Sequence, residues 1–141
     1  MKRIRTVLTD SLIFAAVFLV AAVVFVMFMN VVRDGVQSIV YDTMGMTFAG
    51  FFAVQVGLVV GFIWSLGFPL FSRQRLTKPV VAAMLTSAVI AGGGVALMMV
   101  YSSRNWQVLR SINGMGQTIE YTIVGLIGGR MAYNRRVKRS Q

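Results

Sequence analysis

The sequence predicts an all-α integral membrane protein, a four-helix bundle with both chain ends on the cytoplasmic side. Of its 141 residues, 57% are hydrophobic and 13% are charged, whereas soluble domains carry about 25% charged residues. Long apolar runs recur along the chain, and most basic residues lie between or after them. No linker separates two parts, so residues 1–141 are expected to form a single transmembrane domain.

Three of the apolar runs are plainly long enough to cross a bilayer. A spanning helix needs about 20 apolar residues, and residues 11–32, 44–71 and 79–101 each provide them. The first run exceeds the roughly 7–15 residues of a cleaved signal sequence, so we expect it to remain as a helix. Pro79 favours a helix start, because the first turn makes no use of the N–H that proline lacks.

A fourth span is expected over residues 117–133, although this run contains Glu120 and Arg130. The distribution of positive charge decides in its favour. With the N-terminus inside and four spans, eleven of the 14 Lys and Arg residues face the cytoplasm, as the positive-inside rule requires. Three spans would place the strongly basic tail outside.

The two loops expected on the outer side carry apolar residues at helical spacing. Val36, Ile39 and Val40 recur in the first loop, and Trp106, Leu109 and Ile112 lie three apart in the second. Each loop is either a short amphipathic segment at the membrane interface or an irregular loop.

Small residues recur at every fourth position of the second expected helix and therefore share one face. Because lipid tails are as apolar as leucine, close approach over small residues is what brings membrane helices together. We expect the second, third and fourth helices to pack most tightly. The sequence leaves open whether the small residues pack this chain's own helices or dock a partner. The residues in question are Ala49, Ala53, Gly57, Gly61, Ser65, Gly92, Gly93, Gly94, Gly125 and Gly129.

Few polar side chains lie within the expected spans. Gln55 is the one strongly polar residue deep in a span, where it could bond across helices or line a path. Glu120 lies near the outer end of the fourth helix, and the two residues together form a possible polar pathway. Asp10, at the cytoplasmic edge of the first helix, is expected to act as an N-terminal cap or dipole partner.

The basic clusters predict contact with anionic lipid rather than nucleic acid, because they flank spanning helices. Each basic residue near such a surface contributes about 1 kcal/mol. The residues expected to do so are Arg73, Arg75, Lys78, Arg135, Arg136, Lys138 and Arg139.

The composition argues against an enzyme. The chain has no cysteine and no histidine, and it lacks paired carboxylates, a serine with a base, and a phosphate-binding loop. We expect no catalytic residue, no metal and no cofactor. The predicted function is a non-catalytic multi-pass protein of a bacterial inner membrane, the cytoplasmic membrane, that acts through protein–protein interaction in the bilayer. It would be a complex subunit, an assembly factor or an exclusion or immunity-type protein.

The expected partners are membrane lipids together with another membrane protein or copies of this chain. The alternative function is a small oligomeric channel or transporter, with Gln55 and Glu120 lining its path.

Overall fold

The computed structural model describes residues 2–35, 43–71 and 78–140. These residues form an all-α bundle, as predicted. Its elements are α1 (Lys2–Asp34), α2 (Thr43–Phe71), α3 (Pro79–Ser103), the 3-10 helix η2 (Trp106–Arg110) and α4 (Ile112–Ser140).

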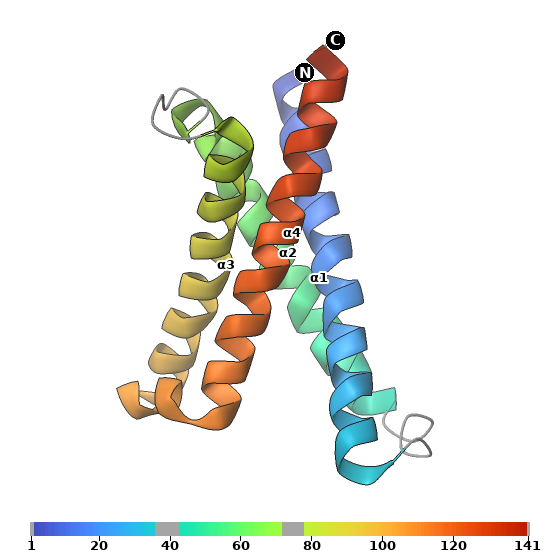
Figure 1. Cartoon of the computed structure of the whole chain (residues 1–141), viewed down its shortest axis with the longest axis vertical. Coiled ribbons are helices and arrows are strands. Elements are labelled where there is room, and N and C mark those ends of the chain that lie inside the picture. Colours follow the sequence, from blue (N-terminus) through green and yellow to red (C-terminus); the bar gives the residue numbers. More distant parts are fainter. Residues whose placement is uncertain (1, 36–42, 72–77, 141) are drawn as a thin grey trace.

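The four long helices run alternately up and down, so the two chain ends lie side by side at one end of the bundle (Figure 1). The most extensive pairing joins α1 to α2, followed by α3 to α4. The contacts of α2 with α3 and of α1 with α4 are fewer. The expectation that the second, third and fourth helices pack most tightly is therefore wrong, because the molecule consists of two helix pairs.

The bounds of α2 and α3 agree with the predicted spans to within two residues. In contrast, α1 begins well before residue 11, and α4 extends beyond 117–133 at both ends. The apolar runs mark only the part of a helix that prefers hydrocarbon. A helix satisfies its own backbone hydrogen bonds and can continue into water with polar residues on its surface.

Three helices, α1, α2 and α3, are long and apolar enough to cross a membrane, so the chain is a multi-pass membrane protein. Among the described helices, α4 does not reach that apolarity. It nevertheless runs the length of the bundle beside the others (Figure 1). The face of α4 that packs inward includes Tyr121, Val124 and Ala132, which are buried.

Aromatic side chains fill the centre of the bundle and connect three of its helices. The Phe14 ring of α1 lies 5.6 Å from the Trp64 ring of α2, and the Phe18 ring lies 5.4 Å from the Tyr121 ring of α4, both measured between centroids. The Trp64 indole Nε1 donates a 2.9 Å hydrogen bond to the Ala83 carbonyl oxygen of α3. Aromatic packing thus joins α1, α2 and α4, and one polar bond adds α3.

The connection from α3 to α4 turns at Arg104, whose φ of 52° is left-handed. The Asn105 side chain then accepts a 2.9 Å hydrogen bond from the Gln107 backbone N–H, which caps η2. Of the two segments expected in the outer loops, the second is helical, with Trp106 exposed. Positions 36 and 39–40 of the first lie outside the described residues.

Candidate functional site

The small residues of α2 form its contact with α1. A Cβ added at Gly57 would lie 2.7 Å from the Cα of Ala15, and one added at Gly61 would lie 2.6 Å from the Cα of Ser11. Real Cβ atoms do not approach backbone so closely, so both positions need glycine. Ala53 and Ser65 are buried on the same face and Ala49 is half-buried. The two backbones therefore meet over this strip.

The glycines of α4 form a second close contact, with α3. A Cβ at Gly125 would lie 2.7 Å from the Ser87 carbonyl oxygen, and one at Gly129 would lie 2.9 Å from the Ala83 carbonyl oxygen. The Ser87 hydroxyl also donates a 2.7 Å hydrogen bond to the Gly125 carbonyl oxygen. This bond across two helices has the form that stabilises membrane bundles.

The glycine run of α3 divides into two parts. Gly92 is buried against Thr122 of α4, whereas Cβ atoms added at Gly93 and Gly94 would meet nothing within 4 Å. Two of the ten small residues singled out in the sequence are thus exposed and are not used to pack this chain.

A buried ionic cluster lies toward the end of the bundle that holds the chain ends. Asp10 of α1 is fully buried. Its Oδ2 accepts a 3.0 Å hydrogen bond from the Ser65 hydroxyl of α2 and a 2.9 Å bond from Nε of Arg136 of α4. The Arg136 NH2 group also donates to Asp10, and it donates to the Ser65 oxygen at 2.5 Å. We call Asp10, Ser65, Arg135 and Arg136 the Asp10 cluster.

Aromatic rings surround the Asp10 cluster, and its second arginine, Arg135, faces the other carboxylate oxygen of Asp10. The Arg136 guanidinium lies 4.1 Å from the Phe68 ring centroid and 5.2 Å from the Trp64 ring centroid, which are cation–π contacts. None of the described residues donates a hydrogen bond to Asp10 Oδ1, but Arg135 NH1 lies 3.9 Å away. Two positive charges thus face one buried carboxylate.

The expectation for Asp10 is wrong. Because α1 begins at Lys2, Asp10 lies in its third turn and caps nothing, and the helix dipole acts only within the first turn. The sequence did offer a signal, an acid at the edge of an apolar run and arginines expected at the same end of the bundle. It offered no way to pair residues 126 positions apart.

The residues expected to hold anionic lipid fall into different settings. The side chains of Arg136 and Arg135 are only 18% and 23% exposed and face Asp10. Lys78 and Lys138 are exposed. Positions 73 and 75 lie outside the described residues, and the side chain at 139 is not described.

The structure places Gln55 in a pocket that Glu120 does not line. This pocket is an apolar groove of about 370 Å³ between α2 and α3. The Gln55 amide is exposed there and forms no hydrogen bond with any residue that the structure describes. We call this the α2–α3 groove; its lining includes Phe52, Gln55, Val59, Ile90, Gly94 and Met98.

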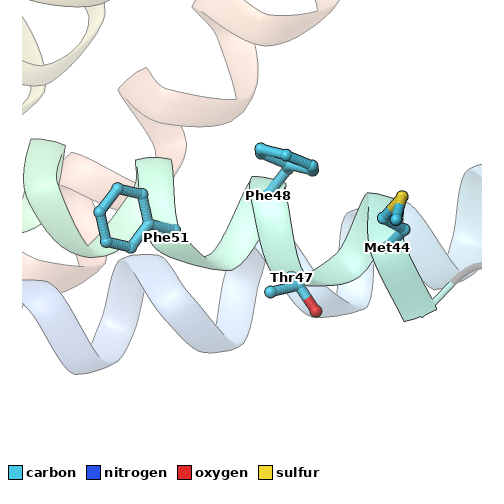
Figure 2. Close-up of a pocket in the computed structure, with 4 residues that line it drawn as sticks. All are labelled: Met44, Thr47, Phe48 and Phe51. Carbon is cyan, nitrogen blue, oxygen red and sulfur yellow. The ribbon is translucent and has the colours of Figure 1, made fainter.

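A shallow aromatic surface extends the exposed side of α2 beyond the groove. Figure 2 shows Met44, Thr47, Phe48 and Phe51, all from α2, with both phenyl rings projecting outward. Phe48 and Phe51 are 72% and 67% exposed. Since Phe48, Phe52, Gln55 and Val59 follow one another at spacings of three or four, they share one face of the helix.

Within the described ranges, no group of three or more acidic, histidine or cysteine side chains could hold a metal ion. Comparison of the chain with protein-family models, with curated proteins and with solved structures finds no match.

Proposed function

We propose that this chain is a non-catalytic protein of a bacterial inner membrane that binds a transmembrane helix of another membrane protein in its α2–α3 groove. The observation that supports this most directly is the Gln55 amide, which is exposed in an apolar groove without a hydrogen-bond partner among the described residues. An amide without a partner in an apolar medium costs several kcal/mol. A polar group on a bound helix would remove that cost.

The shape of the groove also suits a helix. Gly94 lies on its wall with nothing within 4 Å of an added Cβ, and glycine allows two helix backbones to approach closely. The exposed face of α2 continues from Gln55 through Phe52 to Phe48, which lengthens the contact surface along the helix axis. A helix bound there would complete the packing that α2 and α3 leave unfinished.

The proposal includes four spans with both ends in the cytoplasm. Eleven of the 14 basic residues lie on that side if α4 crosses, as the positive-inside rule favours. The Asp10 cluster supports the crossing, since it ties the C-terminal part of α4 to α1 near the N-terminus. Reporter fusions at both ends test this part, and reporters on opposite sides of the membrane would contradict it.

A channel made from several copies is supported less well. Its path would need Gln55 and Glu120 on one continuous surface, and Glu120 does not line the groove that holds Gln55. A flux assay in liposomes addresses this alternative. Flux lost in both Gln55→Leu and Glu120→Gln would favour it over the binding function.

The decisive experiment is site-specific photo-crosslinking in cells. A photoreactive residue at Val59 or Gly94 lies in the groove, and one at Val24, on the exposed side of α1, serves as the matched control. We expect one discrete adduct from the groove positions, lost with Gln55→Leu, and none from Val24. An adduct of twice the chain mass would identify a second copy as the partner. No adduct, or equal adducts at all positions, would refute the proposal.

A further inference from the structure

A second groove lies between α1 and α2, toward the end of the bundle that holds the chain termini. It measures about 350 Å³ and has one charged lining residue, Arg3. The rest of the lining is apolar apart from Ser11, and its main members are Ile4, Val7, Leu8, Phe62 and Leu66. We propose that this Arg3 groove binds a phospholipid with an anionic headgroup, its phosphate on Arg3 and one acyl chain along the apolar lining.

The apolar part of the groove is open to its surroundings. Ile4 and Leu8 are 73% and 62% exposed, and Phe62 and Leu66 are each about half exposed. These side chains come from α1 and α2, and a hydrocarbon chain lying against them would make many small dispersion contacts. A charged mouth followed by an apolar body matches a single amphiphile.

The charge at the mouth of the groove is available for a ligand. Arg3 is exposed and has no ion-pair partner among the residues that the structure describes. The acidic residue nearest in sequence, Asp10, is buried and held by Arg136 and Arg135. The planar guanidinium fork of arginine matches a phosphate in two-point geometry. The positive charge therefore selects an anionic headgroup over a zwitterionic one.

The site is separate from the α2–α3 groove. Phe62 and Leu66 line the Arg3 groove, whereas Val59 and Ile63 line the other. The lipid proposal therefore does not depend on the proposed function. It also differs from a general attraction of basic tails to the membrane, because it assigns the charge contact to one arginine.

Native mass spectrometry of the purified full chain tests this assignment. The protein is mixed in detergent with phosphatidylglycerol or phosphatidylcholine, and bound lipid is counted for the wild type, Arg3→Gln and Arg5→Gln. Arg5 is the matched control, since it is exposed on the same helix and does not line the groove. The substitution Arg5→Gln removes the same charge as Arg3→Gln. We expect Arg3→Gln to weaken phosphatidylglycerol binding about fivefold, as the loss of one basic contact predicts, and Arg5→Gln to weaken it less than twofold.

A third variant tests the apolar half of the site. Leu66→Trp places a larger side chain in the groove and should lower the binding of both lipids. Equal losses from Arg3→Gln and Arg5→Gln would show diffuse charge attraction and overturn the proposal. So would unchanged binding in Arg3→Gln, or displacement of the lipid by inorganic phosphate at constant ionic strength.

Discussion

The two sides of α2 differ in how completely the chain covers them. On the side that faces α1, Gly57 and Gly61 bring two backbones into direct contact, and Ser65 bonds to a buried carboxylate. On the side that faces α3, a groove stays open, and Gln55 has no hydrogen-bond partner among the described residues. One face of α2 is thus covered by α1, and another face is left partly open by α3.

The difference shows what decides the role of a small or polar residue in a membrane helix. Gly61 and Gly94 are the same residue type, yet only Gly61 has a neighbouring backbone opposite it. Ser65 and Gln55 are both polar, yet only Ser65 has a charged group within reach. A residue type therefore indicates that an interface is possible, and the facing helix decides whether this chain or another molecule completes it.

The largest effect is expected from breaking the ionic contact on the α1-facing side. Asp10→Ala leaves the Arg136 guanidinium without its main counter-charge, and losing one partner of a buried pair costs roughly 3–5 kcal/mol. Titration of the protein in mixed micelles with a denaturing detergent gives the free energy of unfolding, and its decrease measures the loss. Because Arg136 remains 18% exposed, a value near the lower end is expected.

Two further variants interpret that loss. Arg130→Gln removes an exposed arginine of the same helix and should change the free energy of unfolding by no more than about 0.5 kcal/mol. The double variant Asp10→Leu with Arg136→Met removes both charges and should recover most of the stability. A wild-type stability in Asp10→Ala would contradict a structural role for the cluster.

A smaller loss is expected from enlarging a glycine on the α1-facing side. Gly61→Leu drives a side chain into the Ser11 backbone, and overpacking costs roughly 1–3 kcal/mol. The same change at Gly94 meets open space and should leave the thermal midpoint in detergent unchanged. Equal shifts in the two variants would contradict the difference between the two sides of α2.

Removing the neutral member of the Asp10 cluster should have a moderate effect. Ser65→Ala deletes the hydrogen bond to Asp10 and the one accepted from Arg136 while keeping the residue small, at a cost of about 1–2 kcal/mol. Unfolding in mixed micelles measures it, and Ser102→Ala on an exposed surface of α3 is the control. A loss as large as that of Asp10→Ala would mean that the ion pair with Arg136 contributes little by itself.

The smallest effect on stability is expected on the α3-facing side. Gln55→Leu replaces an amide that has no partner in the described structure, so the isolated chain should change by less than about 0.5 kcal/mol. The same variant should lose the crosslinked adduct proposed above. Leu58→Met, an exposed change outside the groove, should keep both properties. A marked loss of stability in Gln55→Leu would show that the amide serves this chain's own fold.

The helices could be predicted from the sequence because apolar length alone defines a span. Residues 44–71 and 79–101 correspond closely to α2 and α3. The fourth helix was also expected, although its extension to Ile112–Ser140 was not. Hydropathy identifies only the segments that prefer lipid, and the N-terminal end of α1 and the C-terminal end of α4 are rich in charge.

The pairing of the helices could not be predicted in the same way. A strip such as Gly57 and Gly61 marks a surface for close approach, but several facing helices would satisfy it equally. The Asp10 cluster illustrates the same limit, since its members come from α1, α2 and α4. Which residues of different helices meet is determined by three-dimensional packing, and no local sequence pattern contains that information.

The contact between Asp10 and Arg136 also has a consequence for how the protein is made. The two residues are 126 positions apart, and at a synthesis rate of about 5–20 residues per second the arginine is added roughly 6–25 s after the aspartate. During that interval the Asp10 carboxylate lacks its Arg136 partner. Until α4 is synthesised, water at the membrane surface solvates the carboxylate, so the final arrangement of α1 depends on the synthesis of α4.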